Sequence, residues 1–410
     1  MYHGRRRLSR LCNVIATLLF CLIFLLVLKR MCFITFSYYP NPPLEPKNRN
    51  QKDHVVTYGA SYLKPAFLKT IVVWTRYFGE WGWEIIAENS MKSCPTKCMY
   101  TRDKNLLENA NAVLFNANDM WKYRTLIGTL YEFPIPMPNV RTPNQVWILL
   151  SIEPMNTMRV SMNQYGFNWT TLYRRESTVY YPFTNRFKMS PDEINKSEKH
   201  SKGVSENHFK TKTKFAATMI SNCDDDARRY KIIRELKRYV DIDEFGDCSG
   251  NVICQYRKSP NECKQLYEYK FYLAFENSFC RDYVSEKFWL TYDRGQIPII
   301  AAPKYNLEML PPKSYLNVFD YNSIQELADE MVKVGDNETL YNSYFDWMKI
   351  YKREKKSIYC RLCEELYANR TAQNYIDMDE WINDDICEKQ TLWSSLSALI
   401  ERWLFDIGLV

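Results

Sequence analysis

Short hydrophobic runs punctuate the first half of the chain. Three of them, Thr70–Trp74, Ala112–Phe115 and Val146–Ile152, carry few polar side chains. A strand buried on both faces has no polar side, so runs of this kind are typical of parallel strands covered by helices. We therefore predict a parallel sheet with helices on both sides in this half of the chain.

The second half alternates predicted strands and helices. Phe215–Ile220 has the pattern of a buried strand, and Ala227–Val240 repeats apolar residues at helical spacing before Ile242–Gly246 starts another strand. The alternation continues through Phe271–Phe275, Tyr283–Tyr292, Ile297–Ala301, Tyr315–Phe319 and Ser323–Val334. It predicts a second open parallel sheet that faces the first, with ligands in the cleft at the carboxyl ends of the strands.

A polar stretch separates the two predicted sheets. Residues 185–214 are rich in Lys, Ser and Asn. About thirty residues without secondary structure would be unusual inside one compact domain. We therefore predict that this stretch is a linker between two domains.

The N-terminal segment differs from the rest of the chain. Leu11–Leu28 is uncharged for eighteen positions, and a cluster of four arginines precedes it. Such a helix crosses most of a bilayer and keeps its basic flank in the cytosol. We predict a cytosolic tail over residues 1–10, a transmembrane signal-anchor over 11–28 and a proline-containing stem over 29–67, with the body in the lumen. A cleaved signal peptide is the alternative, and the lack of a small-x-small cleavage site disfavours it.

Charge follows the same division. The chain has a formal net charge of +7, but its first 67 residues contain ten basic and two acidic residues, which leaves the remainder close to neutral. Nucleic-acid binding needs clustered positive charge on a folded surface. We therefore expect no nucleic-acid partner.

Ten cysteines lie in the predicted lumenal body, an even number that favours disulfides in an oxidising compartment. The pairs Cys94/Cys98 and Cys360/Cys363 could instead be half-sites for zinc, but neither has a second cysteine pair or histidines at a suitable spacing. We expect these four residues to form disulfides, with Cys360 linked to Cys363. Four Asn-x-Ser/Thr sequons also suit a glycosylated, secretory-pathway body. They are Asn168, Asn195, Asn337 and Asn369.

The candidate chemistry concentrates between Tyr269 and Lys287. The sequence YKFYLAFENSFCRDYVSEK contains a hydrophobic strand, a polar turn and then a predicted helix that opens at Asp282. The free N–H groups and the dipole of a helix N-terminus favour an anionic ligand. An ordinary helix start, with Asp282 or Ser285 as its cap, is the alternative. Glycine-rich phosphate loops and the common hydrolase and metalloprotease motifs are absent from the sequence.

This tract resembles the signature of the α1,3-fucosyltransferases. YKFYLAFENS, DYVSEK and GQIPII follow one another in the family's order. FNWT at 167–170, YRRES at 173–177, SNC at 221–223 and the C-x-x-C at 360–363 are similar to other family segments. The resemblance extends from about residue 70 to about residue 390. It departs from the family at Glu153-Pro154, where the family has a serine between the two residues.

The resemblance implies an α/β fold of the GT-B type, with two facing Rossmann-like domains. The acceptor-side domain would span residues 68–205, the GDP-fucose-binding domain 206–350 and a C-terminal helical segment 351–410. The implied reaction is transfer of L-fucose from GDP-β-L-fucose, with inversion, to the 3-hydroxyl of GlcNAc in a glycoprotein or oligosaccharide. Glu153 matches the family's catalytic base. The implied donor contacts are Arg229, Asn277, Tyr283, Glu286 and Lys287.

The resemblance also implies a single-pass type II protein of the Golgi membrane, and it leaves a homodimer open. We expect no required metal, because Arg229 and Lys287 would stabilise the departing diphosphate, although Mn²⁺ or Mg²⁺ could stimulate the reaction. Three alternatives remain at this point: a metal site at Asp224–Asp226, a role for Arg228 in place of Arg229, and a different function for the fold. The different function would be sugar-nucleotide binding without turnover, or transfer from another nucleotide sugar.

Overall fold

The computed structural model describes residues 68–126, 129–154, 161–183, 186–194, 207–223, 227–253, 263–354, 356–368, 377–383 and 387. All of them belong to one unit, Lys64–Val410. The predicted tail, anchor and stem lie outside the described residues. Within the described residues, no helix combines the length and the apolar character needed to cross a membrane.

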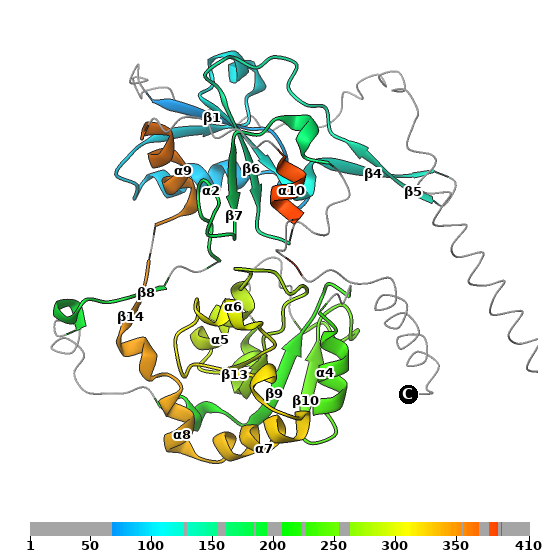
Figure 1. The fold of residues 1–410 in the computed structure, drawn as a ribbon, viewed down its shortest axis with the longest axis vertical. Helices are drawn as coiled ribbons and strands as arrows, with labels where there is room; N and C mark the ends of the chain where they lie inside the picture. The colour runs from blue at the N-terminus through cyan, green and yellow to red at the C-terminus, as the bar shows by residue number, and fades with distance from the viewer. Residues whose placement is uncertain are drawn as a thin grey trace, which may run out of the picture. The chain divides into compact units, whose positions relative to one another are not determined.

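The first sheet contains five parallel strands in the order β2-β1-β3-β6-β7. The strands are β1 (Lys69–Val73), β2 (Cys98–Thr101), β3 (Ala112–Asn116), β6 (Val146–Ser151) and β7 (Trp169–Leu172). The three runs predicted from the sequence form β1, β3 and β6, which lie next to one another (Figure 1).

The second sheet also has five parallel strands, in the order β10-β9-β11-β12-β13. The strands are β9 (Lys214–Met219), β10 (Ile242–Phe245), β11 (Tyr269–Leu273), β12 (Ile297–Ile300) and β13 (Leu316–Asn317). The prediction of two parallel sheets is therefore confirmed. The strand predicted over Tyr315–Phe319 is shorter than expected, because a 3₁₀ turn, η8 (Val318–Asp320), begins directly after Asn317.

Helices cover the sheets. The α-helices are α2 (Trp83–Met91), α4 (Arg229–Leu236), α5 (Glu286–Asp293), α6 (Lys304–Leu307), α7 (Ile324–Gly335), α8 (Glu338–Ser343), α9 (Ile358–Tyr367) and α10 (Met378–Asn383). The other 3₁₀ turns are η1 (Lys104–Asn109), η2 (Ala117–Asp119), η4 (Asn163–Tyr165), η5 (Phe209–Thr211), η7 (Lys264–Glu268) and η9 (Asp346–Lys349). A separate antiparallel hairpin joins β4 (Trp121–Leu126) to β5 (Thr129–Pro134).

Burial on both faces explains why the strands read as continuous hydrophobic runs. Successive residues of β1 point to opposite faces of the sheet. Ile71 and Val73 pack in one hydrophobic core with α2 and α9, whereas Val72 packs in a second core with α10. All three side chains are fully buried. The first sheet therefore carries a core on each face, as the sequence pattern predicts for a covered parallel sheet.

The predicted linker is partly ordered. Within residues 185–214, β8 (Arg186–Lys188) pairs antiparallel with β14 (Tyr351–Arg353). Strand β14 lies where the chain leaves the second sheet and returns toward α9. The expectation of a stretch without secondary structure is therefore wrong. A three-residue strand is too short to stand out in a sequence pattern, and its partner is more than 160 positions away.

The end of the chain returns to the first sheet. Helix α9 contributes Ile358, Leu362 and Leu366 to the core beneath β1, and Figure 1 shows it beside α2. Helix α10 contributes Met378 and Ile382 to the core on the opposite face. The C-terminal helices are therefore structural parts of the first sheet's layers.

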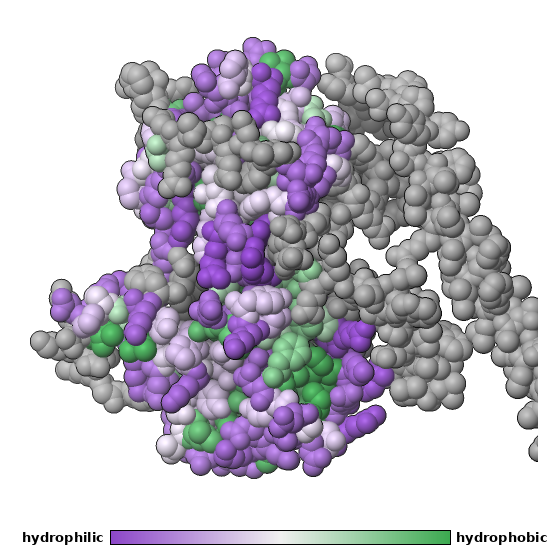
Figure 2. Space-filling view, viewed as in Figure 1, coloured by the Kyte–Doolittle hydropathy of each residue, from purple (hydrophilic) through white to green (hydrophobic). Residues whose placement is uncertain are grey.

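Hydrophilic residues cover most of the described surface in the view of Figure 2.

Candidate active site

The turn after β6 presents Glu153. The hydroxyl of Ser151 donates a hydrogen bond to the carbonyl oxygen of Glu153 at 3.0 Å and accepts one from its N–H at 3.2 Å. Parallel strands end at the same edge of a sheet, so this turn lies at the edge where ligands of open α/β sheets bind. Ser151 therefore fixes this turn from the strand that precedes it.

The carboxylate of Glu153 meets a residue of the second sheet. The hydroxyl of Tyr283 lies 3.4 Å from Glu153 Oε2 and donates to it. Burial raises the pKa of Glu153; Lys287 opposes that rise, the carboxylates of Glu286 and Glu276 add to it, and the Tyr283 hydrogen bond opposes it. The net effect is a raised pKa, which suits a carboxylate to accept a proton near neutral pH.

On the second sheet, Glu276 follows β11 and organises the start of α5. Its Oε1 accepts a hydrogen bond from the N–H of Ser285 at 2.7 Å, and its Oε2 lies 3.4 Å from the ammonium of Lys287. Ser285 caps α5 by accepting from the N–H of Lys287. The helix therefore begins at Glu286, and the prediction that it opens at Asp282 is wrong. Asp282 has a backbone φ of 66°, a left-handed conformation that ends regular structure there.

Lys287 keeps its positive charge inside the site. Burial lowers the pKa of its ammonium, but Glu276, Glu286 and Glu153 together outweigh burial, and the net pKa is raised. The nearest of these carboxylate oxygens, on Glu276 and Glu286, lie 3.4 and 3.8 Å away. The site thus holds a cation whose charge acts on Glu153.

A second cation comes from α4. Arg229 is 2% exposed, and its guanidinium donates to the carbonyl oxygen of Asn222 at 2.8 Å. Its charge opposes protonation of Lys287, so the two cations are electrostatic neighbours. Arg228 is exposed and adopts a left-handed φ of 53° at the helix start. Of Arg228 and Arg229, it is therefore Arg229 whose side chain is buried near Lys287. Asp224–Asp226 lies outside the described residues.

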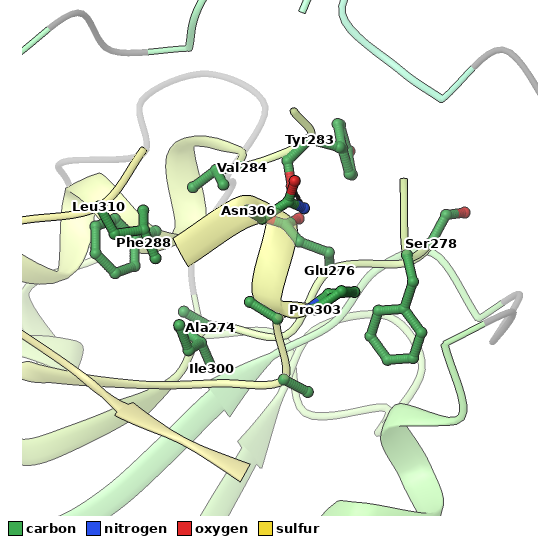
Figure 3. A pocket seen from close by; sticks show the side chains of 13 residues that line it. Ala274, Glu276, Ser278, Tyr283, Val284, Phe288, Ile300, Pro303, Asn306 and Leu310 are labelled. Carbon is green, nitrogen blue, oxygen red and sulfur yellow. Dashed lines mark hydrogen bonds between the residues drawn. The ribbon is translucent and has the colours of Figure 1, made fainter. Parts of the chain in front are cut away.

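A pocket lies at the carboxyl ends of β11 and β12. It is small, with a cavity volume of about 20 Å³. In Figure 3, Tyr283, Glu276 and Asn306 gather on one side of this pocket, and the hydrophobic side chains of Phe288 and Leu310 lie on the other. A small pocket therefore lies at the carboxyl ends of strands of the second sheet, the edge at which the ligand site is predicted.

Two buried polar atoms beside this pocket have no hydrogen-bond partner in the structure. They are Oδ1 of Asn277 and Oγ of Ser278, and both residues are more than nine-tenths buried. A buried polar group without a partner costs about 1–3 kcal/mol, so such groups usually meet a ligand or water. Ser278 and Glu276 were not singled out from the sequence, although both belong to the FENS segment.

The two described sequons differ in accessibility. Asn168 is 9% exposed, and its Oδ1 accepts hydrogen bonds from the N–H of Trp147 and from Arg141. Asn337 is exposed and caps α8. A glycan needs an exposed acceptor nitrogen, so Asn337 is the one of these two that the fold presents. Asn195 and Asn369 lie outside the described residues.

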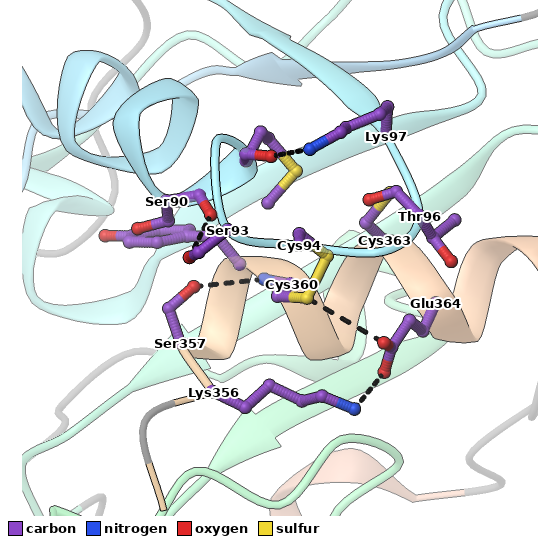
Figure 4. Close-up of a disulfide and its surroundings, with 12 residues drawn as sticks. Ser90, Ser93, Cys94, Thr96, Lys97, Lys356, Ser357, Cys360, Cys363 and Glu364 are labelled. Carbon is purple, nitrogen blue, oxygen red and sulfur yellow. Dashed lines mark hydrogen bonds and ion pairs between the residues drawn. A yellow bond between two sulfur atoms is a disulfide. The ribbon is translucent and has the colours of Figure 1, made fainter.

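The four predicted disulfide cysteines pair differently from our expectation. Cys94 bonds to Cys360 (Figure 4), and Cys98 bonds to Cys363. The expected link between Cys360 and Cys363 is wrong. These two residues are three apart on α9, so their side chains lie next to each other on one helix face, where Cys360 meets the loop after α2 and Cys363 meets the first residue of β2. Further disulfides join Cys223 to Cys248 and Cys280 to Cys387.

The pairing also bears on the zinc alternative. Cys94, Cys360 and Glu364 lie close enough to hold an ion, but the two sulfur atoms are bonded to each other. Zinc requires thiolates, which a disulfide does not offer. The geometry at this position therefore supports disulfide bonds between α9 and the first sheet, and not a zinc site.

Two family models match the chain in sequence order. The model described as "Fucosyltransferase, N-terminal" matches residues 67–184. The model described as "Glycosyltransferase family 10 (fucosyltransferase) C-term" matches residues 209–381. Together they span more than two thirds of the chain.

Curated relatives carry fucosyltransferase names. The alpha-(1,3)-fucosyltransferase fut-6 of Caenorhabditis elegans is 29% identical over 389 residues, covering 87% of this chain and 94% of that protein. The 4-galactosyl-N-acetylglucosaminide 3-alpha-L-fucosyltransferase 9 of Homo sapiens is 28% identical over 330 residues, covering 75% of this chain and 83% of that protein. A crystal structure of an alpha1,3-fucosyltransferase with GDP-fucose aligns with a TM-score of 0.48 at 15% identity, covering 77% of this chain and 96% of that chain.

Proposed function

This chain belongs to the α1,3-fucosyltransferases of glycosyltransferase family 10, and on that premise we propose that it transfers L-fucose from GDP-β-L-fucose to the 3-hydroxyl of GlcNAc in a glycan. The family supports fucosyl transfer. The name of the human relative, a glucosaminide 3-alpha-L-fucosyltransferase, supports the acceptor sugar. The observation that carries the proposal is the contact of Tyr283 with Glu153, because it brings the buried carboxylate that follows the first sheet to the segment of the second that carries Lys287, whose charge acts on Glu153.

Glu153 is the proposed general base. It would take the proton of the acceptor 3-hydroxyl as that oxygen attacks the anomeric carbon of fucose on the face opposite GDP. The new carbon–oxygen bond forms while the bond to the diphosphate breaks, and the bonding electrons leave with GDP. The configuration inverts from β to α. The raised pKa of Glu153 matches this role, since a base is most effective when its pKa lies close to the working pH.

The donor would lie against the second sheet. Lys287 and Arg229 would stabilise the negative charge that grows on the departing diphosphate, which fixed cations do without a resident metal. The unpartnered oxygens of Asn277 and Ser278 suit hydroxyl groups of the nucleotide sugar. Glu286, whose side chain is about one third exposed at the start of α5, suits the ribose hydroxyls.

The cellular setting remains a proposal from the sequence. Residues 11–28 would anchor the chain in the Golgi membrane as a single-pass type II protein, with the two sheets in the lumen. The disulfides of the described body fit an oxidising compartment.

The test is a transfer assay with purified protein. GDP-fucose and an array of glycans ending in, or branching from, GlcNAc should give GDP release that depends on the acceptor, and nuclear magnetic resonance of the product should show an α-linkage to the 3-position. Binding of GDP-fucose without acceptor-dependent release would favour the sugar-nucleotide-binding alternative. Efficient transfer from a different nucleotide sugar would overturn the assignment of the donor.

A further inference from the structure

Two loops from different sheets interlock beside Tyr283. Arg175 follows β7 of the first sheet, and Asp282 precedes α5 of the second. The carboxylate of Asp282 accepts from the Nε of Arg175 at 2.8 Å and from its backbone N–H at 3.0 Å. One residue thus holds both oxygens of one carboxylate, a two-point contact that fixes orientation as well as distance.

The loop that carries Asp282 is held in shape by its own domain. The N–H of Asp282 donates to Asn306 Oδ1 at 2.8 Å, and Asn306 Nδ2 donates to the carbonyl oxygen of Cys280 at 2.9 Å. Asn306 is 2% exposed. If Asp282 moves, the loop therefore moves with it as a unit, and Tyr283, the next residue, moves too.

We propose that Arg175 is a positioning residue for the catalytic base: its ion pair with Asp282 fixes this loop against the first sheet so that the hydroxyl of Tyr283 stays on Glu153. The proposal rests on the function assigned to Glu153. Arg175 acts through Asp282 and Tyr283 and touches neither Glu153 nor the donor cations in the described contacts.

Two kinds of contact hold the Tyr283 loop against the first half of the chain. The ring of Tyr283 meets Tyr173 at 4.9 Å and Phe183 at 5.8 Å, both edge to face. The carboxylate of Asp282 adds a charged contact, and it is 3% exposed. A buried charge that loses its partner is strongly destabilising, so the pair resists separation of the two loops. A second ion pair, Arg281 with Glu176 at 3.0 Å, is more exposed and holds the loops more weakly.

The pH profile of kcat reports on the hydrogen bond between Tyr283 and Glu153. Glu153 is faced by Tyr283, Lys287, Glu286 and Glu276 from the second sheet and by Tyr77 from the first. Of these groups, Lys287 and the Tyr283 hydroxyl lower the pKa of Glu153. If the loop shifts and the hydrogen bond is lost, the pKa of Glu153 rises. The acid limb of the kcat profile then moves to higher pH.

The experiment measures kcat, the KM for GDP-fucose and the pH profile of kcat for variants of the full chain. Arg175→Ala and Asp282→Asn should each lower kcat about 10- to 100-fold, the loss expected when reacting groups are misplaced by about 1 Å, with little change in the KM for GDP-fucose. Both should shift the acid limb to higher pH, as should Tyr283→Phe, which removes only the hydroxyl. The double variant Arg175→Ala/Asp282→Asn should be no slower than the slower single variant, because both changes remove one contact.

The matched control is Arg102→Ala. Arg102 is also an exposed arginine paired with a buried carboxylate, Glu84 at 3.8 Å, but none of its described contacts involves the site. It should leave kcat and the pH profile unchanged. If Arg175→Ala does not fold, Arg175→Lys retains the charge without the two-point geometry and should show the same shift of the acid limb with a smaller loss of kcat.

The outcomes separate this proposal from the function on which it rests. A wild-type kcat and acid limb in Arg175→Ala, or a lower kcat with an unmoved limb, would overturn the positioning role. Turnover at the wild-type rate in Glu153→Gln would overturn the base itself, whatever the Arg175 variants show. A common shift of the limb in Arg175→Ala, Asp282→Asn and Tyr283→Phe supports the proposal.

Discussion

At the scale of single residues, the site pairs a carboxylate of raised pKa with a cation that burial does not neutralise. Lys287 retains its proton because Glu276, Glu286 and Glu153 offset the cost of burial. We expect Lys287→Met to weaken GDP-fucose binding about 10- to 100-fold, since a charge-assisted hydrogen bond contributes about 1.5–3 kcal/mol. Isothermal titration calorimetry measures this, and EDTA should not change the wild-type affinity.

The control for Lys287→Met is Lys270→Met. Lys270 is also half-buried and ion-paired, to Asp336 at 3.8 Å, but it lies near the start of β11, at the opposite end of the strand from the pocket. Its replacement should leave GDP-fucose affinity unchanged. Equal losses in the two variants would show that Lys287 acts through stability and not through the donor.

The sequence indicated the site residues unevenly. Glu153, Lys287 and Arg229 could be named because they stand in motifs and at predicted strand or helix ends. Glu276 could not, because its role depends on the N–H of Ser285 and on Lys287, nine and eleven positions further along the chain. The sequence alone leaves Asp282 and Ser285 as possible caps, and the structure places the cap at Ser285, with Asp282 in a left-handed conformation before it.

At the scale of elements, two disulfides fasten α9 to the first sheet, one at the loop after α2 and one at the start of β2. Cys94–Cys360 and Cys98–Cys363 have sequence separations of 266 and 265, so each closes nearly the same loop. Removing one by paired Cys→Ser changes should cost little stability, because the other still restrains the unfolded chain. Removing both should cost at least about 2–4 kcal/mol, as measured by chemical denaturation. Additive losses would contradict this account.

The pairing itself can be mapped with trypsin. Lys97 lies between Cys94 and Cys98, and Arg361 lies between Cys360 and Cys363, so complete cleavage separates all four cysteines. Non-reduced peptides should contain Cys94 with Cys360 and Cys98 with Cys363. A peptide pair that links Cys360 to Cys363 would contradict the structure.

The sequence predicts elements better than it predicts their partners. The covered strands β1, β3 and β6 stand out because both of their faces are buried. Disulfide partners some 265 positions apart and the pairing of β8 with β14 depend on tertiary structure, which no local pattern encodes. The return of α9 to the first sheet was missed for the same reason.

At the scale of the whole molecule, both sheets and the helices that cover them lie within the unit Lys64–Val410. We expect a secreted form that begins at Lys64 to transfer fucose to a soluble acceptor with the kcat of the full-length protein. The comparison needs equal amounts of folded protein, checked by circular dichroism. A folded but inactive truncated form would show that the preceding residues contribute to catalysis.

The central claim is that Glu153 takes the proton of the acceptor. The most direct test is single-turnover transfer by Glu153→Gln at saturating GDP-fucose, together with the affinity of the variant for GDP-fucose. The wild-type rate should fall as the pH drops through the raised pKa of Glu153, because the protonated carboxyl cannot act as a base. The variant should lose about 10²–10⁴-fold in rate and bind GDP-fucose nearly as well as the wild type. A variant that transfers fucose at the wild-type rate would contradict the claim.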